Sequence, residues 1–162
     1  MSQPSPQPDK DNAGVIAPPP LIFAGVFALA LGIDIATSGP SLGLPDQARY
    51  IGGLALFLVG IALPLTAATR FRAAGTHVRP WKAATALVTS GIYRYTRNPM
   101  YLGMALIYVS FSVFADSVIA LILLLPLLAV ITYGVISREE RYLEVKFGAP
   151  YREYKGKVRR WI

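Results

Sequence analysis

Long apolar stretches constrain the fold of this chain more than any other feature of its sequence. A helix needs about 20 apolar residues to cross the roughly 30 Å hydrocarbon core of a bilayer. The 54% hydrophobic composition and the mean hydropathy of +0.46 are typical of integral membrane proteins. The sequence therefore predicts an all-α, polytopic protein with about four transmembrane helices. The predicted spans are residues 21–37, 50–69, 99–114 and 118–136.

The last two spans form one apolar stretch that is interrupted at Ala115-Asp116-Ser117. A single helix over residues 99–136 would be about 57 Å long, nearly twice the thickness of the bilayer core. We therefore expect a helical hairpin in which Asp116 is a turn residue rather than a catalytic acid. Asp34 lies close enough to the end of its span to reach headgroups and water, so we do not assign it a function. In the second span, Gly52, Gly53 and Gly60 predict close helix packing.

The remaining segments are polar. Residues 1–20 are rich in Pro, Gln, Asp and Asn, which predicts a disordered tail and not a signal peptide. Residues 21–162 are expected to form a single membrane domain. The connection 70–98 is long, basic and aromatic, and connections of this length are usually functional. Residues 137–162 form a charged, amphipathic C-terminal tail whose helix continues to Phe147 and ends at Gly148 and Pro150.

The positive charges predict the orientation. Of the Lys and Arg side chains, six lie in 70–98 and eight in the tail, whereas 38–49 has one and 115–117 has none. The positive-inside rule then places the two basic segments and both termini in the cytoplasm. The net charge of +7 is interpreted as contact with anionic membrane lipids and not with nucleic acid.

Several chemistries are excluded by composition. The chain has no cysteine, which excludes thiolate metal sites and cysteine nucleophiles. Its one histidine, His77, cannot build a multi-histidine centre, and we expect no metal. A Ser-His-Asp triad would need His77, and no GxSxG motif supports one.

The hairpin brings residues 97–101 next to Glu139 and Glu140 at one membrane surface. Carboxylates and aromatic faces suit a cationic ligand, and arginines suit a carboxylate or phosphate. The sequence thus predicts a site for a zwitterionic, positively charged cofactor, with a hydrophobic or lipid substrate from the bilayer. A structural alternative remains for each part, since the glutamates can pair with Arg138 or Arg141 and the tyrosines can be interfacial anchors.

The segment LVTSGIYRYTRNPMYLG (87–103), followed by EERYLEVKFGAPYREYKGKVRRWI (139–162), resembles the isoprenylcysteine carboxyl methyltransferase-like family. Phospholipid N-methyltransferases share the same pattern. The matching positions are Gly91, Tyr93, Arg97, Pro99, Tyr101, Gly103, Glu139, Glu140, Leu143, Phe147, Gly148, Tyr151 and Tyr154.

This resemblance implies transfer of a methyl group from S-adenosyl-L-methionine to a lipid-like carboxylate or amine at the cytoplasmic surface. It implies cofactor binding by Val88, Tyr93, Arg97, Asn98, Pro99, Tyr101, Glu139 and Glu140. Substrate binding falls to Tyr151, Tyr154 and Arg159, beneath a tail that acts as a lid. The catalytic candidates are Arg160, which would orient a carboxylate, and Glu140, which would take a proton from an amine.

One position departs from the family pattern. The residue before Pro99 is usually histidine and is Asn98 here, which forms hydrogen bonds but does not titrate near neutral pH. We interpret the role of this position as hydrogen bonding. Two alternatives stay open: a membrane NADPH-dependent reductase of related architecture, and a non-catalytic membrane subunit that keeps the fold.

Overall fold

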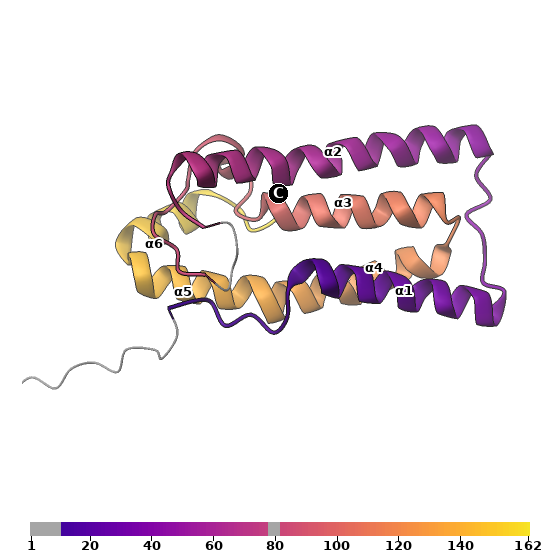
Figure 1. The fold of residues 1–162 in the computed structure, drawn as a ribbon, viewed down its shortest axis with the longest axis horizontal. Helices are drawn as coiled ribbons and strands as arrows, with labels where there is room; N and C mark the ends of the chain where they lie inside the picture. Colours follow the sequence, from indigo (N-terminus) through magenta and orange to yellow (C-terminus); the bar gives the residue numbers. More distant parts are fainter. Residues whose placement is uncertain (1–10, 78–81) are drawn as a thin grey trace, which may run out of the picture.

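The computed structural model describes residues 11–77 and 82–162, which form a bundle of helices (Figure 1). This confirms the predicted all-α class. Residues 1–10 of the expected tail and residues 78–81 of the long connection lie outside the described residues. In chain order the elements are α1 (Pro19–Thr37), α2 (Asp46–Ala73), the short 3₁₀ helix η1 (Gly91–Arg94), α3 (Pro99–Phe114), α4 (Val118–Ile131), the π-helical turn η2 (Thr132–Ile136), α5 (Ser137–Phe147) and α6 (Ala149–Lys157).

Among the described residues, three helical segments are long and apolar enough to cross a membrane: α1, α2 and the continuous helix from Val118 to Phe147. The 16-residue α3 is shorter, about 24 Å at 1.5 Å per residue. Helix α2 extends beyond the predicted 50–69 at both ends. Asp46 in its first turn and Arg70 and Arg72 in its last turn complement the helix dipole, which favours these extra turns.

The predicted hairpin is present, with α3 and α4 joined at Ala115-Asp116-Ser117. Asp116 has a positive φ of 56°, and the Ser117 hydroxyl caps α4 by accepting a hydrogen bond from the Ala120 amide at 2.9 Å. The loop between α1 and α2 docks on this turn, since the Leu42 amide donates to Asp116 Oδ1 at 3.1 Å. Asp116 is therefore a turn residue, as predicted. The Asp34 carboxylate accepts a hydrogen bond from Ser117 and so links α1 to the same turn.

Helix α3 packs closely on α2 through small residues. A Cβ atom on Gly103 would lie 2.5 Å from Pro64 Cδ and 2.6 Å from the Gly60 carbonyl oxygen. The Ser110 hydroxyl donates to the Gly53 carbonyl at 2.7 Å. Gly53 and Gly60 thus have the predicted packing role, whereas Gly52 has no such neighbour within 4 Å.

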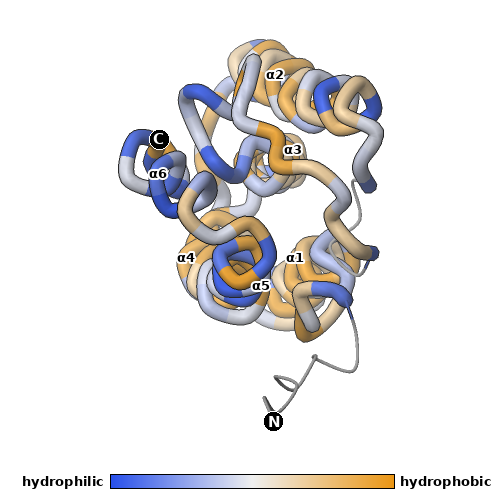
Figure 2. Tube along the Cα trace, turned by 90° about the vertical axis from the view of Figure 1, so that its left-hand side faces the viewer, coloured by the Kyte–Doolittle hydropathy of each residue, from blue (hydrophilic) through white to orange (hydrophobic). Residues whose placement is uncertain are grey.

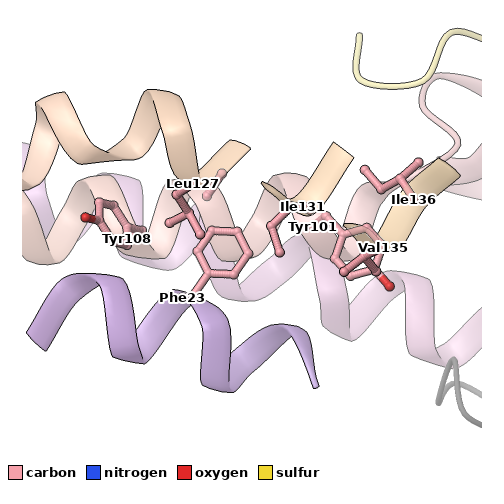
Figure 3. Close-up of a cluster of buried hydrophobic side chains, with 8 residues drawn as sticks. Phe23, Tyr101, Tyr108, Leu127, Ile131, Val135 and Ile136 are labelled. Atoms are coloured by element: carbon pink, nitrogen blue, oxygen red, sulfur yellow. The ribbon is translucent and has the colours of Figure 1, made fainter. Parts of the chain in front are cut away.

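A second interface joins α3 to α1, α4 and η2 (Figure 3). Buried side chains fill it in a row: Phe23, Tyr101, Ala105, Tyr108, Leu127, Ile131, Val135 and Ile136. The apolar row ends where α5 begins, and hydrophilic residues gather on α5, α6 and the neighbouring loops (Figure 2). One end of the bundle is therefore polar, and both the start of α3 and the start of α5 lie there.

Candidate functional site

A cavity of about 130 Å³ lies at this polar end. Its walls come from the segment before α1, the end of α2, the connection that follows it, η1, the start of α3, α5 and α6. The lining residues are Ala13, Phe71, His77, Lys82, Ala84, Ala86, Leu87, Val88, Tyr93, Arg97, Asn98, Pro99, Met100, Tyr101, Glu139, Glu140, Tyr142, Leu143, Tyr151 and Tyr154.

The residues expected to bind a cofactor all lie on these walls. They are Val88, Tyr93, Arg97, Asn98, Pro99, Tyr101, Glu139 and Glu140. Two residues expected to bind substrate, Tyr151 and Tyr154, line the same cavity. Arg159 and Arg160 lie outside the lining, although the Arg160 side chain contacts a wall residue. The geometry therefore brings most of the predicted residues together, while their roles stay predictions.

Glu140 is the centre of a buried ion-pair cluster. Its Oε1 accepts hydrogen bonds from Arg97 at 2.8 Å and from Arg160 Nε at 3.0 Å, and its Oε2 accepts from Arg160 at 2.7 Å. The fork of Arg160 on one carboxylate is the bidentate geometry that gives the strongest guanidinium contacts. The hydrogen bond to Glu140 raises the pKa of Arg160. Both carboxylate oxygens of Glu140 thus accept hydrogen bonds from arginine side chains.

The end of the chain lies against the start of α3 (Figure 1). The Arg97 amide donates to the Arg159 carbonyl at 3.0 Å, and the Asn98 side-chain amide donates to the Arg160 carbonyl at 2.9 Å. The Arg97 guanidinium also donates to the Lys155 carbonyl at 2.7 Å. Asn98 therefore acts as a hydrogen-bond donor that holds the tail, which is the kind of contact that the hydrogen-bonding interpretation requires. Arg159 contributes its carbonyl, while its residue is exposed.

Glu139 has different surroundings from its neighbour. It accepts a hydrogen bond of 2.5 Å from the Tyr101 hydroxyl. Within residues 11–77 and 82–162 it forms no ion pair. Consecutive helical residues point about 100° apart, so Glu139 and Glu140 reach different parts of the wall. The cavity therefore has one cation-paired carboxylate and one carboxyl group that is held by a phenol.

Tyrosines form the aromatic part of the wall. The Tyr154 hydroxyl donates to the Tyr93 carbonyl at 2.8 Å, which joins α6 to η1. Burial raises the pKa of Tyr93, Tyr151 and Tyr154. Tyr154 and Glu139 add to this effect at Tyr93, and Glu140 and Glu139 add to it at Tyr151. These phenols therefore stay neutral at physiological pH and supply ring faces and hydroxyl groups.

Several lining residues were not predicted from the sequence, among them Phe71, His77, Lys82, Tyr142 and Leu143. Tyr142 and Leu143 could have been predicted from helical periodicity. They follow Glu139 by three and four residues and therefore share its helical face. The others come from the α2 end and its connection, where no periodicity marks a wall. In the part of the chain that the structure describes, no group of three or more His, Asp or Glu side chains is placed to hold a metal ion.

Comparison with known proteins supplies the family. The family model described as phospholipid methyltransferase matches residues 48–150. An uncharacterized protein of Haemophilus influenzae is 43% identical over 63 residues, which are 39% of this chain and 100% of that protein. The family match includes α2, η1, the hairpin and α5, so it covers most of the elements that line the cavity.

Proposed function

Because the chain belongs to the phospholipid methyltransferase family, a family of membrane methyltransferases, we propose that it methylates a lipid acceptor at the cytoplasmic surface with S-adenosyl-L-methionine as donor. One observation carries this proposal: a single cavity at the polar end of the apolar bundle gathers two carboxyl groups, an arginine and several aromatic rings. Such a mixture suits a ligand that is at once cationic, anionic and aromatic.

The walls fit the chemical groups of this donor. Arg97 Nε is buried and has no hydrogen-bond partner within the described residues, so it can donate to the carboxylate of the methionine part. The rings of Tyr93 and Tyr101 suit the sulfonium charge and the adenine face. When bound, this cofactor supplies a methyl group that is already activated by its positive sulfur.

The protein then has to position the acceptor, exclude water and manage one proton. An amine acceptor must lose a proton before or during methylation. Glu139 is the better proton acceptor, because both oxygens of Glu140 already receive hydrogen bonds from arginines. Arg160 and Glu140 then hold the tail over the cavity, and a carboxylate acceptor would require Arg160 to leave Glu140. We therefore favour a phospholipid amine over a prenylated carboxylate.

The orientation belongs to the same proposal. Charge distribution supports a cytoplasmic location for the cavity and for both termini, since the Lys- and Arg-rich α5, α6 and end of α2 lie at one end of the bundle (Figure 1). The acceptor would come from the bilayer with its headgroup at the level of the cavity. Phe71, Leu87, Met100 and Leu143 give the cavity an apolar side that suits this substrate.

Ligand binding to the purified protein in detergent tests the proposal. We expect S-adenosylhomocysteine to bind with micromolar affinity and NADPH not to bind. We also expect Tyr101→Ala to weaken the binding by roughly tenfold, because it removes an aromatic face from the wall and the hydrogen bond that positions Glu139. Tyr133→Ala is the matched control, because the Tyr133 ring is 73% exposed on η2 and lies outside the cavity. Binding of NADPH alone would support the reductase alternative, and binding of neither ligand would support the non-catalytic subunit.

A further inference from the structure

The described part of the N-terminal segment lies against α5 and η2 through several contacts. Asp11 forms an ion pair with Lys146, whose Nζ lies 2.7 Å from each carboxylate oxygen. The Arg138 guanidinium donates to the Gly14 carbonyl at 2.9 Å. Hydrogen bonds from Lys146 and Tyr142 lower the pKa of Asp11, so its carboxylate is charged at neutral pH. Polar contacts with α5 thus hold the segment at both Asp11 and Gly14.

An apolar contact adds to these polar ones. Ile16 covers Gly134 of the π-helical turn so closely that a Cβ atom there would lie 2.6 Å from Ile16 Cδ1. Ala13, between Asp11 and Ile16, is one of the residues that line the cavity. The segment 11–16 therefore contributes to the cavity wall through Ala13.

Tyr142 connects this segment to two other parts of the wall. Its hydroxyl donates to Asp11 Oδ1 at 2.8 Å and accepts from the Ala84 amide at 3.0 Å. The same oxygen accepts from Lys146 Nζ at 3.0 Å. A single phenol on α5 thus holds the N-terminal segment on one side and the connection after α2 on the other.

We propose that residues 11–16 are a strap that closes one side of the cavity, with Tyr142 as the positioning residue that fixes the strap and residues 84–88 on α5. The strap slows exchange of ligand between the cavity and solvent. The identity of that ligand rests on the proposed function, so the experiment includes a measurement that requires no ligand.

The first measurement is the dissociation rate of S-adenosylhomocysteine from the 162-residue protein in detergent. Asp11→Ala should raise this rate by about 2- to 5-fold, the range expected for the loss of an exposed ion pair. Tyr142→Phe should raise it on the order of 10-fold, because the Ala84 amide also loses its acceptor. The conservative variant Asp11→Glu should stay close to the wild-type rate. Glu153→Ala is the control, since Glu153 pairs with Lys157 on exposed α6 at 2.5 Å and neither residue lines the cavity.

The second measurement uses the absence of natural cysteine. A single Ala86→Cys substitution places a thiol on the cavity wall, and its rate of reaction with a polar maleimide reports access without any cofactor. Combining Ala86→Cys with Asp11→Ala or Tyr142→Phe should speed this reaction by factors similar to those above, and combining it with Glu153→Ala should not.

The two measurements separate the strap from the proposed function. Faster labelling in a protein that binds no S-adenosylhomocysteine would support the strap and reject the methyl donor. An unchanged labelling rate in both Asp11→Ala and Tyr142→Phe would overturn the strap, whatever the protein binds. Faster labelling in Glu153→Ala to the same degree would also overturn it, because the effect would then come from general loosening.

Discussion

Glu140 shows how one buried carboxylate can hold a site together. It is 5% exposed and balances Arg97, whose side chain is 10% exposed, and Arg160, which belongs to the C-terminal tail. Through these two arginines it joins α5 to the start of α3 and to the end of the chain. Desolvation of such a cluster is costly, so its net contribution to stability is small while it is intact. Loss of one partner is different, because it leaves an uncompensated buried charge.

Glu140→Ala should therefore lower the free energy of unfolding by about 3 kcal/mol, the lower end of the range for breaking a buried pair. Glu144→Ala, one turn later on α5, removes a half-exposed pair with Lys155 and should cost less than about 1 kcal/mol. Chemical denaturation of both variants in detergent micelles measures the difference. An equal decrease in the free energy of unfolding in both variants would show that burial does not make the Glu140 cluster more important for stability than the half-exposed pair.

At the scale of helices, the closest packing lies between α2 and α3. Gly60 and Gly103 let the two backbones approach, and the Gly60 carbonyl lies where a larger residue at 103 would place its Cβ. Because α3 begins at Pro99 beside the cavity, its position against α2 also sets the position of Arg97 and Tyr101. Packing inside the bundle is thus coupled to the geometry of the site.

Gly103→Ala should destabilise the protein by about 1–3 kcal/mol, as overpacked substitutions in helix interfaces do. Gly52→Ala is the control, because it has the same gain in helix propensity, about 1 kcal/mol. A Cβ atom on Gly52 would meet no atom within 4 Å, so this variant should be as stable as the wild type or more stable. Thermal unfolding of the two variants in one detergent provides the comparison. A stable Gly103→Ala protein would mean that α2 and α3 separate easily, and the proposed coupling to the site would be wrong.

The sequence carried enough information for the elements but not for every contact at the site. Asp116 in a long apolar stretch predicted the hairpin, and the hairpin placed 97–101 beside Glu139 and Glu140. The π-helical turn could not be predicted, because Thr132–Ile136 reads as ordinary apolar helix. The roles of Ala13 and of the Arg159 and Arg160 carbonyls were also missed. The two carbonyl contacts could not be predicted, because every residue has a backbone carbonyl and no sequence pattern marks the ones that accept. The placement of Ala13 depends on the ion pair between Asp11 and Lys146, which are too far apart in the sequence for a local pattern to predict their contact.

At the scale of the whole molecule, the ends of the bundle differ in charge. Loop 38–45 and the turn between α3 and α4 lie at one end, and α5 and α6 lie at the other (Figure 1). Residues of α5 and α6 line the cavity. Within the apolar bundle, Tyr108 packs edge-on against Phe23 and Phe27 at ring distances of 6.3 and 5.6 Å. A molecule of this form in a bilayer exposes its two ends to two compartments, and the proposed reaction takes place at the cytoplasmic surface. The proposed function therefore requires one orientation.

Single cysteines in the cysteine-free chain test this orientation. Leu44, which is 44% exposed, lies in the loop before α2, and the exposed Gly156 lies near the end of α6. In intact cells that express the protein, a maleimide that does not cross membranes should label Leu44→Cys and leave Gly156→Cys unlabelled until the membrane is permeabilised. The physical reason is the concentration of Lys and Arg at the α6 end, which resists transfer across the membrane. The reverse labelling pattern would place the cavity away from the cytoplasmic supply of methyl donor and would contradict methylation at this cavity, even if the isolated protein bound S-adenosylhomocysteine.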